Sequence, residues 1–513
     1  MSTPALLDRL KEAALDGEAS QAQEIATCLV KERGEKPSLE MYRALILSNT
    51  SHDAGSAWRV AELLDDLHED GFDPDSAICH AALKALAVHP DHLLRADVLE
   101  RMHARWFAVS TEGAQDIVAG LLREGLLEQA TSRLDKMRQE GVAIPAWLLD
   151  MTVYCLVDVD EIAAAYRIMQ YRFDSGEPNI SRELWAHLLD KASQCRQHAA
   201  TSLVWSSQVA QRYLNPSSGI CLNVLSTAAQ AGDAVLATDV CARLSKRGTK
   251  FQPIHFELLT NTYMAMDPPD WKRALSILTI MPLEKIEPSA LETRSLFAYL
   301  RGHLSDLREA LNTLRELHGQ GRKIPIAALN LLIECHVHNQ DLPAALSIYK
   351  QIHTFVPLAD GAGKSFANIE TFNHLFRGCR TAGGGAQPEQ ASFLISELHQ
   401  LGIRPTVLTY DRLMLVFVQA AQKKSRQSSD GKRREILDWA ARYFEEMKSR
   451  DMMPRFGTIQ LLAIQLAREA DKRCWSVMQE SQDRAAQIEG WKENANRLWA
   501  NVEREWAKFN GLE

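Results

Sequence analysis

Small and apolar residues recur along this chain in a fixed phrase that ends in glycine and proline. A small residue is followed by an apolar residue at position seven, a glycine at eleven and a proline soon after. Positions zero, four and seven lie on one face of an α-helix. The glycine falls where a helix ends in a left-handed C-cap, and the proline blocks further helix. The best copies are Ala130, Met137, Gly141, Pro145; Ala237, Leu244, Gly248, Pro253; Ala310, Leu317, Gly321, Pro325; and Ala391, Leu398, Gly402, Pro405.

The spacing of the prolines that close these segments predicts a repeat protein. Pro216, Pro253, Pro288 and Pro325 follow one another at intervals of 37, 35 and 37 residues. A period near 35 residues is typical of a helical pair, and arrays of such pairs bury their apolar faces only against neighbours. We therefore expect an all-α solenoid without a single globular core. Weaker copies extend the series at Gly34 to Pro37, Gly71 to Pro74, Gly176 to Pro178, and Pro454.

The helix that opens after each proline carries a family resemblance. Segments beginning at Pro405, Asn368 and Pro37 place Tyr410, Phe372 and Tyr42 early in the helix, twice with a threonine just before the aromatic residue. These segments resemble the pentatricopeptide repeat, which opens with threonine, an aromatic residue and asparagine and closes with glycine and proline. No unit carries the early Trp, Leu-Gly and Tyr of the tetratricopeptide repeat.

The resemblance covers roughly residues 20–475 and implies a right-handed superhelical α-solenoid of about 11–13 helix-turn-helix repeats. We divide the chain into an N-terminal helical cap or degenerate repeat, divergent repeats, better-matching repeats and an amphipathic capping helix. These parts span residues 1–36, 37–325, 326–474 and 475–513, with loop insertions expected near 356–368, 383–388 and 422–434.

The family reads RNA with side chains on the first helix of each repeat, one base per repeat. By resemblance, the reading position is the residue after the aromatic, paired with the residue after the closing proline. In the best units these are Asn330 with Asn368, Asn373 with Thr406, and Asp411 with Arg455. Asparagine at this position suggests a pyrimidine. Other units offer Arg43 with Asp75, His80 with Ser110, Gln115 with Ala146, Asn223, Glu257, Arg294 with Ile326, and Gln460.

Each of these residues has a plainer interpretation, namely an exposed polar position on a helix that must be polar somewhere. The chain's net charge is −8 and its pI about 6.1, which is unusual for a nucleic-acid-binding domain. Glu257 and Asp411 would repel phosphate. The recurrence of polar residues at one register favours a binding groove, and a positive stripe along the first helices would favour RNA as its ligand.

A basic segment forms a second candidate RNA contact. It carries Lys423, Lys424, Arg426, Lys432, Arg433 and Arg434. Such a loop could grip a phosphate backbone. Because no aromatic residue is interleaved, a solvated loop is the alternative.

The sequence offers no catalytic or cofactor site. Nine cysteines are scattered, and the histidine pairs His336 with His338 and His89 with His92 lack further ligands for zinc. Residues 361–365 resemble the end of a phosphate-binding loop, but Leu358 replaces the required first glycine. The nuclease or deaminase signatures of some relatives are also missing. We expect no enzyme activity, no metal and no cofactor.

The pattern of the C-terminal segment predicts an amphipathic helix whose apolar face is rich in aromatic residues. It is expected either to cap the array or to dock a partner protein. Its apolar positions recur at three- and four-residue steps: Trp491, Ala495, Leu498, Trp499, Val502, Trp506 and Phe509.

Two functions remain open on this evidence. The first is a monomeric, non-catalytic single-stranded RNA-binding factor of mitochondrial gene expression, acting on transcript stability, processing or translation. The second is a protein scaffold, such as a respiratory-complex assembly factor or a ribosome-associated protein. The resemblance implies the mitochondrial matrix, although the N-terminus is too acidic for a presequence. Otherwise the protein is cytoplasmic. No stretch is apolar enough to span a membrane.

Overall fold

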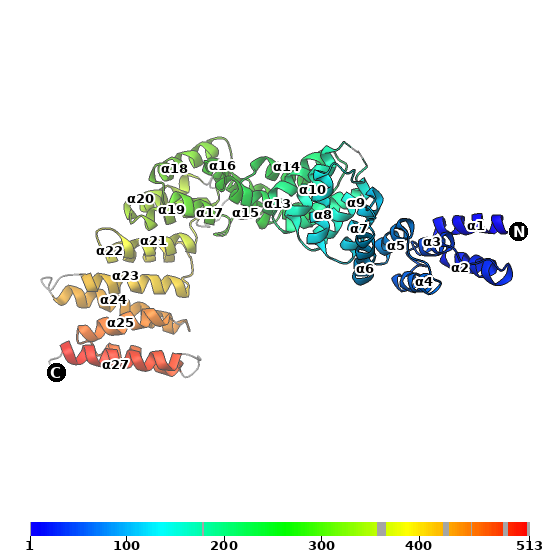
Figure 1. Cartoon of the computed structure of the whole chain (residues 1–513). Coiled ribbons are helices and arrows are strands. Elements are labelled where there is room, and N and C mark those ends of the chain that lie inside the picture. The colour runs from blue at the N-terminus through cyan, green and yellow to red at the C-terminus, as the bar shows by residue number, and fades with distance from the viewer. Residues whose placement is uncertain are drawn as a thin grey trace. The chain divides into compact units, whose positions relative to one another are not determined.

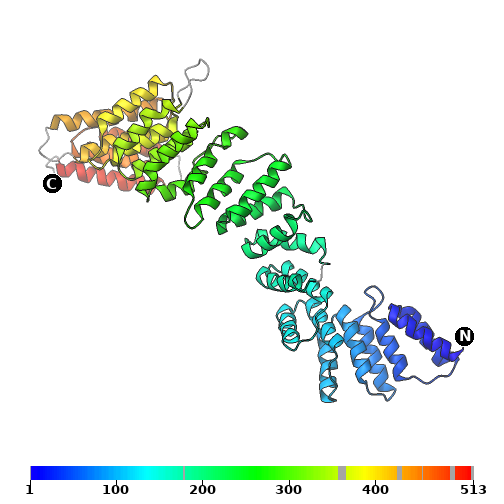
Figure 2. The ribbon, with the colours of Figure 1, turned by 90° about the horizontal axis from the view of Figure 1, so that it is seen from above.

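A computed structural model describes residues 2–176, 179–355, 366–423, 430–452, 454–485 and 491–509. Within these residues the chain forms 27 α-helices and no β-strand (Figures 1 and 2). The chain divides into two compact units, Met1–Thr227 and Ala228–Glu513. None of the described helices combines the length and the apolar content that crossing a membrane would require.

Unit 1 is a stack of helical hairpins. Odd-numbered helices are the first helices of their hairpins and even-numbered helices the second. They are α1 (Thr3–Asp16), α2 (Ala19–Thr27), α3 (Leu39–Ser48), α4 (Ala57–Glu69), α5 (Ser76–Val88), α6 (His92–Ala104), α7 (Thr111–Arg123), α8 (Leu127–Gln139), α9 (Ala146–Asp158), α10 (Ile162–Asp174), α11 (Arg182–Gln194) and α12 (His198–Val204).

The division between the units falls inside α13, whose residues up to Thr227 belong to unit 1, and unit 2 continues the same alternation from the end of this helix. Its helices are α13 (Ser218–Ala231), α14 (Ala234–Lys246), α15 (Pro253–Met264), α16 (Trp271–Leu278), α17 (Arg294–Leu300), α18 (Leu304–Gly319), α19 (Ile326–His338), α20 (Leu342–Gln351), α21 (Ile369–Thr381), α22 (Pro388–Gln400), α23 (Val407–Lys423), α24 (Asp430–Ser449), α25 (Phe456–Arg468), α26 (Arg473–Ala485) and α27 (Trp491–Phe509).

First helices stack on first helices. In unit 2, α19 packs against α21, α21 against α23, α23 against α25 and α25 against α27, and Figure 1 shows them lying one above another. Each first helix also packs against its own second helix, as α23 does against α24. The described helices α1 to α26 pair into 13 hairpins, which confirms the predicted α-solenoid and its repeat number.

The glycine and proline phrase terminates second helices as predicted. Just after α18, Gly321 has φ +84°, its N–H donates to His318 O at 2.9 Å, and the Arg322 N–H donates to Leu317 O at 3.1 Å. This is the Schellman pattern, which satisfies carbonyls that the helix end leaves free. Ala310 and Leu317, the other members of the phrase, are buried. The equivalent Gly141, Gly248 and Gly402 share the left-handed conformation.

Two predicted boundaries are wrong. The basic segment is not a loop throughout 422–434, because α23 continues to Lys423 and α24 already begins at Asp430. The predicted tail from 475 includes most of α26, and the amphipathic helix proper is α27. Residues 356–365, with the phosphate-loop-like segment, lie outside the described residues, as do Pro178 and residues 424–429. The insertion near 383–388 forms the turn between α21 and α22.

α27 packs on the last hairpin. It contacts α25 and α26. Leu498 and Val502 are buried, while Trp499 and Trp506 pack around Trp475 with ring centroids 5.8 and 5.4 Å away. These contacts are those of a helix that covers the apolar face of the final pair. The side chains of residues 491–495 and 509 lie outside the described part.

We expect Gly321→Ala to lower the free energy of unfolding by about 1 to 2 kcal/mol, because Cβ is unfavourable at this left-handed φ. A Cβ at Gly321 meets nothing within 4 Å, so a steric clash does not contribute. Gly319→Ala is the matched control, since Gly319 is equally open but belongs to the right-handed α18. Denaturant unfolding followed by circular dichroism tests this, and equal losses at both positions would contradict it.

Candidate functional site

A cavity on the first helices of unit 2 collects basic side chains. It has a volume of about 360 Å³ and lies among α21, α23 and the N-terminus of α25. Arg377 and Arg380 come from α21, Arg412 from α23, and Arg455 from the residue preceding α25, with Asp411 between them. The acidic chain therefore carries a local concentration of positive charge on its first-helix face.

Helical periodicity places these arginines. Asn373, Arg377 and Arg380 follow one another at steps of four and three, so they share one face of α21. The helix starts at a fixed point because Asn368 caps it: the Thr371 N–H donates to Asn368 Oδ1 at 3.0 Å. The reciprocal bond, Asn368 N–H to Thr371 Oγ1 at 3.2 Å, completes a capping box.

The four guanidinium groups differ in their partners. Arg377 lies 3.4 Å from Glu334 Oε1, and Arg455 Nε lies 3.5 Å from Asp411 Oδ2. Arg380 and Arg412 have no hydrogen bond or ion pair with any part of the chain that the structure describes. Two arginine charges at the cavity are thus not matched by a protein carboxylate in contact.

The electrostatics of the cavity favour an added anion. Burial and repulsion from Arg377 lower the pKa of Arg412, with smaller repulsions from Arg455 and Arg380, and attraction to Glu334 opposes this shift only in part. Burial, reinforced by Arg412 and Arg377, lowers the pKa of His374 to about 4, so this imidazole is neutral at pH 7. A bound anion would relieve the repulsion among the arginines.

The predicted pair Asn330 and Asn368 meets directly. Asn330 Nδ2 donates to Asn368 Oδ1 at 3.1 Å, and Thr371 Oγ1 donates to Asn330 Oδ1 at 2.7 Å. Asn330 is only 4% exposed. The expectation of an exposed polar position is therefore wrong here, because this amide joins one repeat's first helix to the cap of the next.

Other predicted pairs form the same junction. Asp411, 2% exposed, accepts from the Arg455 backbone N–H at 3.1 Å, and His80 Nε2 accepts from the Ser110 N–H at 3.0 Å. Gln115 Nε2 donates to Ala143 O at 3.2 Å, just before the next helix. The candidate reading position thus recurs as an inter-repeat hydrogen-bonding position.

Asn373 differs from these junctions. It is 6% exposed, and its Oδ1 is buried without a hydrogen-bond partner among the described residues. Its predicted companion Thr406 instead bonds Thr409, with hydroxyl oxygens 3.0 Å apart. An amide oxygen without a donor is a costly arrangement that a ligand could relieve.

The remaining predicted positions lie on or before first helices without forming one site. Asn223 is out of register, because Ser217 caps α13 through the Ile220 N–H and the equivalent position is Leu222. Arg294 begins α17, since Ser289 and Glu292 form a turn before it with a 2.7 Å bond. Arg43 is exposed on α3, Asp75 caps α5, and Glu257 and Gln460 are half-buried on α15 and α25.

The basic segment is partly engaged within the protein. Lys432, Arg433 and Arg434 lie in the first turn of α24, and Arg433 pairs with Glu469 at 3.3 Å. Arg433 is mostly buried by this contact, whereas Lys432 and Arg434 are exposed. Phosphate contact by Lys423, Lys424 and Arg426 stays a prediction, since Lys424 and Arg426 and the Lys423 side chain lie outside the described part.

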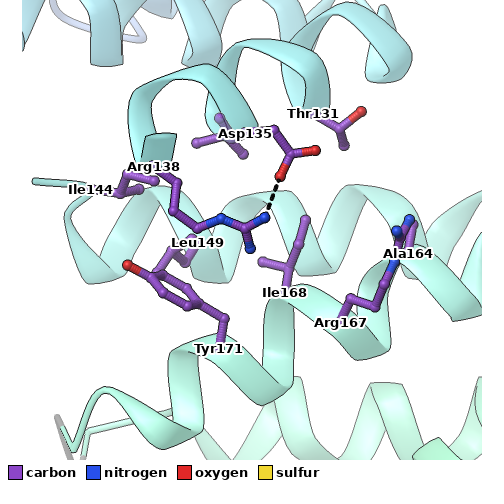
Figure 3. A pocket seen from close by; sticks show the side chains of 10 residues that line it. Thr131, Asp135, Arg138, Ile144, Leu149, Ala164, Arg167, Ile168 and Tyr171 are labelled. Atoms are coloured by element: carbon purple, nitrogen blue, oxygen red, sulfur yellow. Dashed lines mark ion pairs between the residues drawn. The ribbon is translucent and has the colours of Figure 1, made fainter. Parts of the chain in front are cut away.

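A second cavity lies in unit 1, on the side of second helices α8 and α10. It has a volume of about 160 Å³, and Figure 3 shows Arg138 reaching toward Asp135, with which it pairs at 3.1 Å. Arg138 also lies 5.8 Å from the centre of the Tyr171 ring. Because the charge of Arg138 is already paired with Asp135, this cavity is a weaker candidate binding site than the arginine cavity. No group of three or more potential metal ligands occurs in the described chain.

Sequence reasoning named Arg455 as a candidate but missed the other three arginines of the main cavity, Arg377, Arg380 and Arg412. Arg377 stands four residues after Asn373, one turn along the same face, and this spacing could have revealed it. Arg412 gave no such signal, because it adjoins Asp411 and reaches the cavity only through the packing of α23 on α21.

We expect Asn330→Ala to cost about 1 to 3 kcal/mol of unfolding free energy, because it removes both junction bonds and leaves buried polar atoms unpaired. Asn312→Ala is the matched control: Asn312 is exposed on α18 and bonds only Arg315, at 2.9 Å. The cost at Asn312 should stay within about 0.5 kcal/mol. Denaturant titration of the two variants measures the difference, and similar midpoints would refute the structural role of Asn330.

Comparison with known proteins places the repeats in a family. The model described as "pentatricopeptide repeat-containing protein" matches residues 218–352, and the one described as "pentatricopeptide repeat domain" matches residues 366–420. No curated protein matched the chain by sequence.

Solved structures similar to this chain include the pentatricopeptide repeat protein PPR10 from maize, at 14% identity and a TM-score of 0.31. That alignment covers 96% of this chain and 74% of the maize chain. PPR10 in complex with an 18-nt psaJ RNA element aligns at 14% identity and a TM-score of 0.32, covering 99% and 74%. These TM-scores are low, so the assignment depends on the repeats themselves. The two family matches, over hairpins of the expected length, identify residues 218–352 and 366–420 as pentatricopeptide repeats.

Proposed function

We propose that this protein binds single-stranded RNA along the first helices of unit 2. The observation that carries the proposal is the arginine cavity, where Arg377, Arg380, Arg412 and Arg455 converge. Arginine matches phosphate oxygens with a planar fork of donors, and phosphate contacts supply much of the affinity for nucleic acid. The cavity lies within and beside the matched repeat at residues 366–420.

The net charge of −8 is compatible with this role because charge is unevenly distributed within this hairpin. The second helix α22 carries Glu389 and Glu397 and no lysine or arginine, whereas its partner α21 contributes two arginines to the cavity. At physiological salt, charges more than a Debye length of about 8 Å away are largely screened. The electrostatic potential at the cavity therefore depends on the nearby charges more than on the net charge of the chain.

Base contact would begin at Asn373. Its Oδ1 has no donor among the described residues, and an N–H on a base edge would satisfy it once the ligand displaces the side chains that bury this oxygen. Asn330 and Asp411 already hold inter-repeat hydrogen bonds, so a base could use them only by competing with those bonds. Recognition of bases by side chains on successive helical repeats, as in this family, supports single-stranded RNA as the ligand.

The biological role that we propose from RNA binding is non-catalytic. By holding a single-stranded segment, the protein would stabilise a mitochondrial transcript, direct its processing or promote its translation. This part of the proposal depends on the family resemblance, which also supports the mitochondrial matrix as its location.

A protein scaffold is the second candidate, and α9 of unit 1 favours it. Trp147 and Tyr154 are each 50% exposed on one face of this helix, with the acidic Asp158 one turn further. Exposed aromatic residues are enriched at protein interfaces. Crosslinking in cells separates the candidates, because recovery of protein partners without RNA would favour the scaffold.

For RNA binding we expect the double variant Arg377→Gln/Arg412→Gln to weaken binding at least about tenfold, since charge-assisted bonds to phosphate are each worth about 1.5 to 3 kcal/mol. The salt dependence should also flatten, by about 0.7 in log–log slope for each phosphate that the variant no longer neutralises. Fluorescence anisotropy with a labelled RNA pool, about 15 nucleotides long to span one base per repeat, measures both.

Arg442→Gln is the matched control for this experiment. Arg442 is exposed on the second helix α24, where it lies 5.0 Å from the Trp439 ring. Its substitution should leave affinity and slope unchanged. If the control weakens binding as much as the double variant does, the cavity is not the RNA site.

The location is tested by fractionation of cells that express the full-length protein with a C-terminal tag. We expect the tagged protein in mitochondria and protected from added protease until the inner membrane is opened. Recovery in the cytosolic fraction alone would exclude a matrix role while leaving RNA binding open.

A further inference from the structure

The cations of unit 2 do not repeat along the first helices as a phosphate backbone would require. One turn beyond the reading position, successive first helices carry Glu334, Arg377, Leu415 and Ile464 on α19, α21, α23 and α25. Only one of these four residues is basic. A strand read at one base per repeat would place its phosphates at similar intervals, so this register does not supply one cation for each.

The arginines converge on one place instead. Arg377, Arg380, Arg412 and Arg455 line a single cavity of about 360 Å³, together with the hydroxyl-bearing Thr381 and Thr458. Glu334 contacts Arg377 and Asp411 contacts Arg455, which leaves Arg380 and Arg412 without a contacting carboxylate in the described chain. The cavity therefore carries about two unmatched positive charges at one point.

We propose that this cavity binds the terminal phosphomonoester of the RNA, an inference that rests on the proposed RNA-binding function. A phosphomonoester carries about 1.5 to 2 negative charges at pH 7 and three acceptor oxygens, whereas an internal phosphodiester carries one charge. Two guanidinium forks match the monoester in charge and in number of donors.

The neighbouring carboxylate does not oppose this ligand. Asp411 is held by the Arg455 backbone N–H at 3.1 Å and by Arg455 Nε at 3.5 Å. This carboxylate therefore has a basic contact of its own in Arg455. Arg380 and Arg412 stay available to the anion.

The experiment compares three forms of one labelled RNA pool, bearing a 5′-phosphate, a 3′-phosphate or hydroxyls at both ends. An internal fluorescent nucleotide leaves the two ends unmodified. We expect one phosphorylated form to bind about tenfold more tightly than the hydroxyl form, and which one does so identifies the end that the cavity holds.

Variants test the cavity as the cause. Arg412→Gln and, separately, Arg380→Gln should abolish the preference for the phosphorylated end, so that the phosphorylated and hydroxyl forms bind each variant with equal affinity. Arg442→Gln on α24 is the control and should retain the preference. Circular dichroism confirms folding, and having two independent arginine variants keeps the test decisive if one of them unfolds.

Two results would overturn the inference. If all three RNAs bind equally and Arg412→Gln weakens each by the same factor, the cavity contacts internal phosphodiesters, and the RNA-binding proposal survives without the end preference. If the unmodified protein binds none of the three RNAs, the proposed function itself is wrong.

Discussion

Each hairpin in this protein can bury its apolar face only against the hairpins before and after it. The buried cores follow this constraint: in unit 2 a continuous set of apolar residues runs from Phe256 to Val502 through successive helices. Stability in such an array is a sum of neighbouring contacts rather than the property of one centre. Every polar group at a junction between hairpins must therefore find its partner within that junction.

The junction hydrogen bonds show how the chain meets this requirement. Asn330, Asp411 and His80 stand at one register, and each reaches the residue that starts the next first helix. The same register is the one expected to read RNA bases. Asn330, 4% exposed, has its amide nitrogen and oxygen both in junction hydrogen bonds. Asp411, 2% exposed, has Oδ1 engaged in the same way, while its Oδ2 has no hydrogen-bond donor among the described residues. The two roles compete at these positions.

The fold was predictable from the glycine and proline residues that recur at the ends of the second helices. Gly321 and Pro325 specify where α18 ends and α19 begins through local backbone geometry, which requires no knowledge of the tertiary structure. Burial at the reading register and convergence of the arginines were not predictable in the same way. Asn330 is polar, and a helix alone gives no reason to bury it. Its burial follows from Asn368 and Thr371, which lie about one repeat later in sequence. Arg412 likewise approaches Arg377 only because α23 packs on α21.

Asn373 shows what distinguishes a binding position from a structural one in such an array. Its neighbours α19 and α23 use the corresponding side chains to close a junction, but Thr406 turns to Thr409 and leaves Asn373 Oδ1 without a donor. The unsatisfied oxygen lies on the same face of α21 as Arg377 and Arg380. A buried acceptor without a donor costs stability, because it does not recover the hydration it gives up on folding. A nucleotide supplies both missing partners, a base N–H for the amide and a phosphate for the arginines. Under the proposed function, the face of α21 that carries this oxygen and the arginines is therefore where we expect RNA to bind.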